Sequence, residues 1–176
     1  PLQPPLPSKT GQRIDWTNLP GSSLALALSH AITQNKKITV IITPDTLTAN
    51  HLEYELKIFQ QTVPVLHFPD WETLPYDYFS PHQDIISERL ATLYQLGNLQ
   101  SAAIIVPIST LMNRLCPRDY LDGQTFLLKQ KDILPIEATR IRLEKAGYRC
   151  VNQVREHGEF VVRGSIMDIF PMGSTL

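Results

Sequence analysis

A glycine and two serines stand directly ahead of an apolar helical stretch, where an α/β nucleotide-binding domain carries its phosphate loop. A working loop reads GxxxxGKS or GxxxxGKT: backbone N–H groups hold the phosphates, the lysine reaches the β- and γ-phosphates, and the hydroxyl binds Mg²⁺. Here Gly21 is present, but Leu24 stands at the lysine position and Ala25 at the hydroxyl position. The segment therefore predicts a helix N-terminus that lacks the cation and the metal ligand needed for nucleotide hydrolysis.

An aromatic segment between residues 69 and 80 is the second place where chemistry is conceivable. Its aromatic residues are Trp71, Tyr76, Tyr78 and Phe79. Its acidic surroundings are Asp70, Glu72, Asp77 and Asp84. The aromatic rings could stack on nucleic-acid bases, but the carboxylates would repel phosphates, which favours rings that pack the loop onto a sheet. Glu72 and Asp77 as an acid–base pair would need a cleft and raised pKa values, and the sequence indicates neither.

Composition and the remaining reactive residues argue against several classes of function. The chain has 16 Lys and Arg against 17 Asp and Glu, so the basic excess typical of nucleic-acid binding is absent. The five histidines do not form an HExxH pattern, and Cys116 and Cys150 have no paired spacing. We therefore expect no metal, no cofactor and a reduced, cytoplasmic protein. Apolar runs stay below the ~18–20 residues that cross a bilayer, so no membrane partner is expected.

Alternating strands and helices must position these residues in the first part of the chain. The predicted strands cover residues 37–43, 63–68 and 102–107, and the predicted helices cover 24–32, 44–60, 81–97 and 109–114. This order predicts an α/β fold, a parallel sheet with helices on both faces. Thr43 and Ser80 are expected to cap the second and third helices, each with proline at the first helical position. Leu52, Leu56 and Phe59 should line the apolar face of the second helix.

Beyond about residue 122 the pattern changes to that of a small α+β domain. Strands are predicted over residues 125–129, 151–154 and 159–170, and a helix over residues 135–146. Gly147 is expected just past the helix end, and Gly164 should bend the last strand. No closing element follows this strand, so residues 123–176 are interpreted as the first part of a second domain.

Three segments resemble the N-terminal module of the bacterial transcription-repair coupling factors, the Mfd family. They are FPDWETLPYDYFSPHQDIISERL at residues 68–90, VPISTLM at 106–112 and HGEFVVRGSIMDIFP at 157–171. The third resembles a signature that this family shares with the excision-repair subunit UvrB, and the likeness extends over about residues 12–176. It implies a flexible lead-in over residues 1–11, a UvrB-like domain 1a over 12–122 with a degenerate phosphate loop, and the start of domain 2 over 123–176.

The resemblance also implies a function and a set of partners. Domain 2 is the surface that the family presents to the repair subunit UvrA, so this chain would recruit UvrA to RNA polymerase stalled at a DNA lesion. The whole protein would be an ATP-dependent DNA translocase that contacts polymerase and DNA through other domains and masks domain 2 with its C-terminal part. Residues 71–80 are shorter than the UvrB hairpin, so no damage probing is expected. The alternatives are a nucleotide-binding enzyme domain with an atypical phosphate loop and, less favoured, a DNA-binding module.

Arg163 is the candidate partner-binding residue, because it matches a family arginine that contacts UvrA. A guanidinium can bind a carboxylate through two parallel hydrogen bonds. The residues alone also allow a solvated arginine paired with a neighbour such as Glu159. Four further cations follow the predicted helix and its exit: Arg140, Arg142, Lys145 and Arg149. They are interpreted as a solvated face that could widen a basic surface around Arg163. No catalytic residue is assigned.

Overall fold

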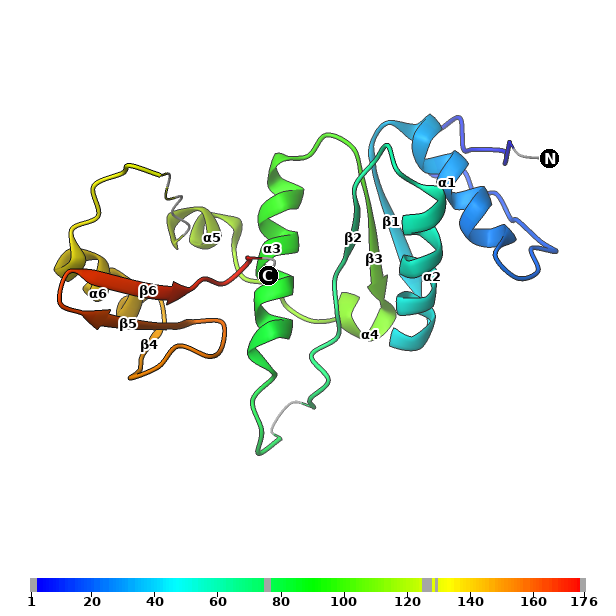
Figure 1. Cartoon of the computed structure of the whole chain (residues 1–176). Helices are drawn as coiled ribbons and strands as arrows, with labels where there is room; N and C mark the ends of the chain where they lie inside the picture. Colours follow the sequence, from blue (N-terminus) through cyan, green and yellow to red (C-terminus); the bar gives the residue numbers. More distant parts are fainter. Residues whose placement is uncertain (1–2, 75–76, 125–127, 129, 175–176) are drawn as a thin grey trace. The chain divides into compact units, whose positions relative to one another are not determined.

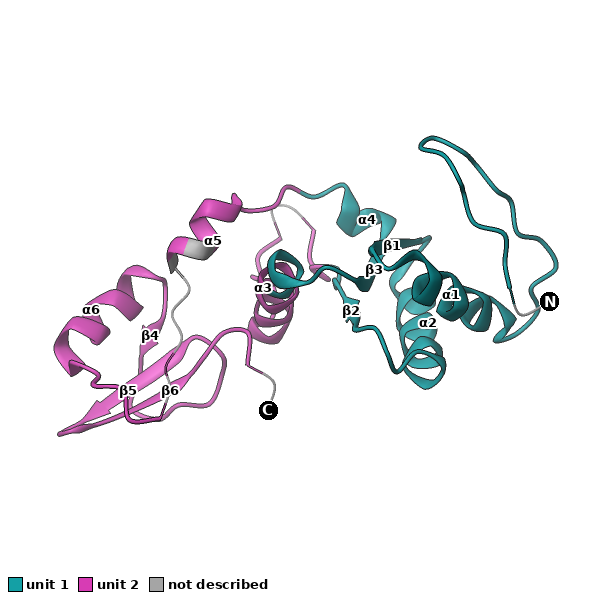
Figure 2. Cartoon of the chain, turned by 90° about the horizontal axis from the view of Figure 1, so that it is seen from above, with its two compact units in different colours: residues 1–70, 95–113 teal, residues 71–94, 114–176 magenta. Residues whose placement is uncertain are grey.

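The computed structural model describes residues 3–74, 77–124, 128 and 130–174. Strands and helices alternate at first, and a strand-rich segment follows (Figure 1). The chain divides into two compact units (Figure 2): unit 1 holds residues 1–70 and 95–113, and unit 2 holds residues 71–94 and 114–176. The predicted domain boundary between residues 122 and 123 stays a prediction.

Unit 1 is built on a three-stranded parallel sheet of order β1-β3-β2 (Figure 1). The strands are β1 (Ile38–Thr43), β2 (Val65–His67) and β3 (Ala102–Pro107). The helices are α1 (Ser23–Asn35), α2 (Thr46–Phe59) and α4 (Ile108–Leu111). Helix α2 contacts all three strands, and α1 packs against α2. The predicted α/β fold with a parallel sheet flanked by helices is confirmed.

The core of unit 1 lies between α1, α2 and the sheet. It contains Ala25, Ile32, Ile41, Ala49, Leu52, Leu56, Ala103 and Ile105. Every residue of the central strand β3 is buried. In the edge strand β1, by contrast, Ile38, Val40 and Ile42 are exposed while Ile41 and Thr43 are buried. The β-branched run over residues 37–43 indicates a strand covered on both faces. In the structure one face of β1 is exposed, and among the described residues only the central strand β3 is buried throughout.

The two predicted helix caps are wrong, and one of the three residues predicted to line the apolar face of α2 is exposed. The Asp45 carboxylate accepts the backbone N–H of Thr48 at 2.7 Å and caps α2, while the Thr43 hydroxyl donates to the Asp45 carbonyl at 3.0 Å. Helix α3 (Gln83–Asn98) begins after Pro81. The backbone N–H groups of Ile85 and Ile86 donate to the His82 carbonyl, so the helix starts later than a cap at Ser80 would place it. Phe59, at the end of α2, is exposed.

A partly buried charge cluster joins α2 to β2 in unit 1. The Glu53 carboxylate lies 3.0 Å from Nδ1 of His67 and 2.5 Å from Nζ of Lys57. Burial raises the pKa of Glu53, but hydrogen bonds and the positive charge from His67 and Lys57 outweigh burial and lower the pKa to about 2. The carboxylate is therefore ionised over the ordinary pH range, and it links a helix to a strand.

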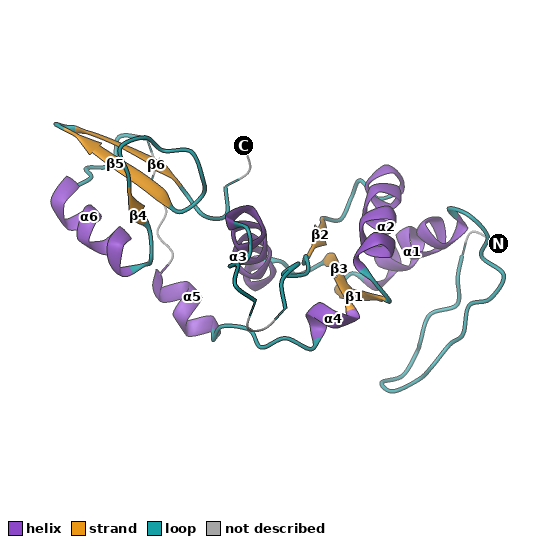
Figure 3. Cartoon of the chain, turned by 90° about the horizontal axis from the view of Figure 1, so that it is seen from below, coloured by secondary structure: helices purple, strands orange, loops and turns teal. Residues whose placement is uncertain are grey.

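Unit 2 contains a small mixed sheet of order β4-β5-β6 (Figure 3). Its strands are β4 (Arg149–Cys150), β5 (Glu159–Arg163) and β6 (Ile166–Phe170). Strand β4 runs parallel to β5, and β5 and β6 form an antiparallel hairpin that turns at Gly164, the predicted bend. Helix α6 (Ile136–Lys145) lies beside β4, as predicted for residues 135–146, and α5 (Arg118–Gln124) was not predicted.

Two predicted strands of unit 2 are not found where the pattern placed them. The strand expected at residues 151–154 is wrong: β4 ends at Cys150, and the following residues are irregular. The strand expected at residues 125–129 falls almost entirely outside the described residues. Both cysteines are free. Among the described residues, no helix is long and apolar enough to span a bilayer.

Candidate functional site

The turn that precedes α1, residues 20–25, is the first candidate site; we call it the Gly21 turn. Gly21 has φ +55°, and Ser22 stands at the N-cap of α1. The Ser22 hydroxyl donates to Oε1 of Glu55 on α2 at 2.5 Å, and the Ser23 hydroxyl donates to the Pro20 carbonyl at 2.6 Å. Both serine hydroxyls are therefore engaged within the protein.

The electrostatics of the Gly21 turn differ from those of a phosphate site. The N-terminus of a helix is an anion-binding position because its free N–H groups and its dipole favour negative charge. Here the Glu55 carboxylate, bonded to the N-cap serine, already supplies that charge. The Leu24 side chain is partly exposed and Ala25 is fully buried. An incoming phosphate would meet a carboxylate and a hydrocarbon side chain.

Polar side chains also meet where β2 and β3 end, the edge at which parallel sheets usually bind ligands. Oδ2 of Asp70, which follows β2, accepts hydrogen bonds from the hydroxyls of Ser109 at 2.5 Å and Thr110 at 2.9 Å, both on α4. These contacts fix the start of α4 against the segment after β2. The cluster thus has a structural role at this edge.

The aromatic segment of unit 2 is only partly packed. Trp71 lies under the guanidinium of Arg89 on α3, 3.9 Å from the ring centroid, and Arg89 is buried. Tyr78 and Phe79 are almost fully exposed, so the prediction that the aromatic rings pack onto a sheet is wrong for these two. Tyr76 lies outside the described residues. The ring of Trp71 is held by the Arg89 guanidinium, whereas the side chains of Tyr78 and Phe79 face solvent.

The two carboxylates of this segment do not form a catalytic pair. The Asp77 carboxylate accepts the backbone N–H of Leu74 at 2.7 Å and closes a turn. Glu72 and Asp77 are both exposed, whereas a general acid–base pair works inside a cleft.

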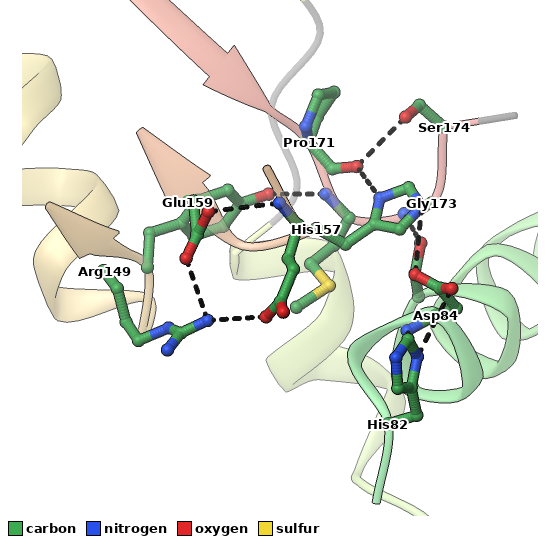
Figure 4. A network of polar contacts seen from close by, with 12 residues as sticks. His82, Asp84, Arg149, His157, Glu159, Pro171, Gly173 and Ser174 are labelled. Atoms are coloured by element: carbon green, nitrogen blue, oxygen red, sulfur yellow. Dashed lines mark hydrogen bonds and ion pairs between the residues drawn. The ribbon is translucent and has the colours of Figure 1, made fainter. Parts of the chain in front are cut away.

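Residues 157–171, here called the hairpin signature, include β5 and β6 and are the second candidate site (Figure 4). The Glu159 carboxylate accepts the backbone N–H groups of Arg155 at 2.8 Å and Glu156 at 3.1 Å, and it lies 3.0 Å from Nη2 of Arg149. The backbone hydrogen bonds from Arg155 and Glu156 lower the pKa of Glu159. Glu159 therefore holds the loop before β5 against β4.

The start and the end of the hairpin signature also hold each other. Nδ1 of His157 donates to the Pro171 carbonyl at 2.8 Å, and the ring packs on Phe170 with centroids 4.2 Å apart. Gly158 has φ +79°, and a Cβ at this position would lie 2.7 Å from Cε of Met172. Figure 4 shows the contact between His157 and Pro171 beside Asp84 of α3. The residues at the two ends of the signature are thus explained by packing.

Two further hydrogen bonds hold the chain after β6 within unit 2. The N–H of Gly173 donates to the Ser87 hydroxyl on α3 at 2.8 Å, and the N–H of Met172 donates to the Tyr148 hydroxyl at 2.8 Å. The chain after β6 is therefore bound to α3, which lies far earlier in the sequence. Sequence patterns gave no signal for this contact, because each partner taken alone is an ordinary polar group.

Arg163 is exposed, unlike His157, Gly158 and Glu159 at the start of the signature. It ends β5, and its Nη2 atom lies 3.4 Å from Oδ2 of Asp168 on β6, with both side chains at least half exposed. The solvated, paired arginine that the residues alone allowed is therefore found, but its partner is Asp168 and not Glu159, which pairs with Arg149. Arg140 pairs with Glu137 and Glu144 along α6. The charges of Arg140 and Arg149 are thus compensated by neighbouring acids, which reduces their share in any basic surface around Arg163.

Comparisons with known proteins bear on both candidate sites. Residues 126–176 match the family model of the UvrB interaction domain. The chain is 49% identical over 176 residues to the transcription-repair-coupling factor of Haemophilus influenzae, covering 99% of the chain and 15% of that protein. It is 45% identical over 171 residues to that of Escherichia coli (97% and 15%) and 33% identical over 134 residues to that of Rickettsia typhi (72% and 12%). The chain spans about 15% of the length of the two most similar of these relatives.

Proposed function

We propose that this chain, an N-terminal UvrB-like module of the transcription-repair coupling factor family, is a docking module that binds UvrA and catalyses no reaction itself. The observation that carries the proposal is the match of residues 126–176 to the UvrB interaction domain, which includes the hairpin and its exposed arginine. In the whole protein, the module would bring UvrA to an RNA polymerase stalled at a lesion, and other domains would contact polymerase and DNA.

Arg163 is the proposed partner-binding residue. Its neighbours His157, Gly158 and Glu159 are each engaged in contacts that hold unit 2 together. Within the described part of the chain, the contact of the Arg163 side chain is an exposed ion pair with Asp168, which contributes little to folding. Its guanidinium therefore remains available to a carboxylate of UvrA, where a charge-assisted, two-pronged hydrogen bond would form.

The Gly21 turn supports a non-catalytic role. Leu24 offers no positive charge to a β- or γ-phosphate, Ala25 offers no metal ligand, and the Glu55 carboxylate is bonded to the N-cap of α1. Each of these three features opposes a bound nucleotide, and a docking function requires none of the groups that have been replaced.

A calorimetric titration of UvrA tests the proposed function. It is performed with the 176-residue chain and with a chain extended by about 40 residues, the scale of a small-domain remainder. Arg163→Ala should weaken binding by about 2 kcal/mol or more, about 30-fold, as expected for a charged interface anchor. Arg155→Ala is the matched control, because Arg155 is also an exposed arginine of unit 2. Equal affinities of wild type and Arg163→Ala, or failure of both chains to bind UvrA, would reject the proposal.

A titration with fluorescent ATP separates this function from the enzyme alternative. No saturable binding is expected at micromolar concentrations, because the triphosphate and its Mg²⁺ find neither cation nor hydroxyl at the Gly21 turn. Saturable binding would favour the nucleotide-binding alternative. A shift assay with duplex DNA, repeated at several salt concentrations, examines the weaker DNA-binding alternative in the same preparation.

A further inference from the structure

The hairpin register brings three different side chains together at the tip of the β5–β6 hairpin. Arg163 lies directly opposite Ile166, and Val161 lies opposite Asp168. Because side chains alternate between the faces of a strand, these four residues share one face. Arg163, Ile166 and Asp168 are exposed, whereas Val161 is buried. We call these three exposed residues the hairpin-tip cluster. It presents a cation, an apolar side chain and an anion on one patch.

The geometry of Asp168 suits it to hold Arg163 in place. The two side chains form a diagonal cross-strand pair, with Oδ2 of Asp168 3.4 Å from Nη2 of Arg163. A guanidinium has five N–H donors, so one exposed contact leaves most donors open to a second carboxylate. An arginine held in one conformation loses less side-chain entropy on binding than a freely rotating one. The ion pair itself is exposed on both sides, so its removal should change folding little.

Ile166 supplies the apolar part of the hairpin-tip cluster. It lies opposite Arg163 in the ladder and is 63% exposed. A single exposed isoleucine is common on protein surfaces. Here, however, it borders a charged group, and an apolar neighbour that excludes water strengthens the hydrogen bonds of a charged pair at an interface.

Building on the proposed binding of UvrA at Arg163, we propose that the hairpin-tip cluster acts as a unit. Asp168 is a positioning residue that orients the Arg163 guanidinium, and Ile166 is an apolar contact beside it. The cluster fits a surface of UvrA that presents a carboxylate next to an apolar side chain, the first for Arg163 and the second for Ile166.

The test is a double-mutant cycle measured by titration with purified UvrA, in the 176-residue chain and in the chain extended by about 40 residues. Asp168→Asn keeps the side-chain volume and should weaken binding about five-fold, a typical size for a coupled contact. Asp168→Glu should restore affinity to within about two-fold. In the Arg163→Ala background, Asp168→Asn should have no further effect, since a positioning residue acts only through the residue that it orients.

Ile166 is tested in the same titrations. Ile166→Ala should weaken UvrA binding about five-fold, as an interface contact next to a charged anchor does. Ile141→Ala and Glu144→Gln on α6 are the matched controls, because they remove an exposed isoleucine and an exposed carboxylate away from the hairpin. Thermal unfolding of every variant shows whether lost binding reflects lost folding.

The outcomes of these titrations are distinguishable. Wild-type affinity of Arg163→Ala overturns the proposed function together with the cluster. Weak binding of Arg163→Ala with wild-type or increased affinity of Asp168→Asn overturns the positioning role alone. The same conclusion follows if the effects of Arg163→Ala and Asp168→Asn simply add. Unchanged affinity of Ile166→Ala removes Ile166 from the binding surface.

Discussion

The Gly21 turn of unit 1 and the hairpin signature of unit 2 each contain a glycine with positive φ, but the surroundings of the two glycines differ. A Cβ at Gly21 would meet no atom within 4 Å, whereas a Cβ at Gly158 would lie 2.7 Å from Cε of Met172. At Gly21 the backbone conformation alone favours glycine. At Gly158 close packing adds to it. The signature is thus maintained by contacts inside unit 2, whereas the Gly21 turn has only its backbone conformation in favour of glycine.

The largest expected effect is that a substitution in the core of unit 2 abolishes UvrA binding, whereas one in the core of unit 1 does not. Phe160→Ala should destabilise unit 2 by about 3–5 kcal/mol and abolish UvrA binding, because the Phe160 side chain on β5 is fully buried. Leu56→Ala removes an equally buried side chain from unit 1 and should cost about 2–5 kcal/mol while sparing UvrA binding at 25 °C. Chemical denaturation and calorimetry measure the two effects. Loss of UvrA binding in Leu56→Ala while that variant remains folded would show that unit 1 takes part.

The two glycines give the next comparison. Gly158→Ala should destabilise the protein by about 2 kcal/mol, since Met172 must change its conformation in addition to the strain of a left-handed alanine. Gly21→Ala should cost only about 1 kcal/mol, from backbone strain alone. Urea unfolding of both variants checks the order, and Met172→Ala combined with Gly158→Ala should recover part of the difference. Equal losses in the two single variants would mean that packing at Gly158 adds nothing.

Acid should weaken the α2–β2 contact of unit 1. The pKa of Glu53 is lowered to about 2 in the folded protein, below its ordinary value of 4.5, so the charged form stabilises the fold at neutral pH. That stabilisation is complete above about pH 5 and is lost as the pH falls toward 2. Glu53→Gln should cost about 1 kcal/mol at pH 7, a value reduced for solvent screening, and should flatten the acid dependence. The free energy of unfolding of both proteins, measured from pH 7 to pH 3, tests this prediction. The same pH dependence in Glu53→Gln and in the wild type would contradict the role assigned to Glu53.

The smallest expected effect concerns the Gly21 turn itself. Leu24→Lys restores the missing cation, yet we expect no saturable ATP binding, because Ala25 still provides no metal ligand and the Glu55 carboxylate can pair with the new lysine. Leu24→Lys combined with Glu55→Gln is the informative second variant. Micromolar ATP binding by Leu24→Lys alone would show that only one residue separates this turn from a working phosphate loop.

Local sequence patterns predicted the elements well where one pattern dominated. The β-branched and apolar runs gave β1 and β3 nearly residue for residue, and the helical periodicity gave α1, α2 and α6. They failed where two local signals competed. Thr43 and Asp45 are both good N-caps, and the choice of Asp45 depends on the end of β1, which retains Thr43 in the sheet. Helix α5 carries a glycine and two aspartates, so its propensity is weak.

The sequence by itself determined the absence of a lysine and a hydroxyl after Gly21, the resemblance to the coupling factors and the position of Arg163 on a strand, because these depend on residue identity and on neighbours close in the chain. Only the tertiary structure decided that Glu55 bonds the N-cap of α1, that Arg163 pairs with Asp168 rather than Glu159, and that Tyr78 and Phe79 face solvent. For the bond of Glu55, the physical reason is distance along the chain: Ser22 and Glu55 are 33 residues apart. Which side chains meet across such a separation depends on how helices and strands pack, and local propensity carries no record of that packing.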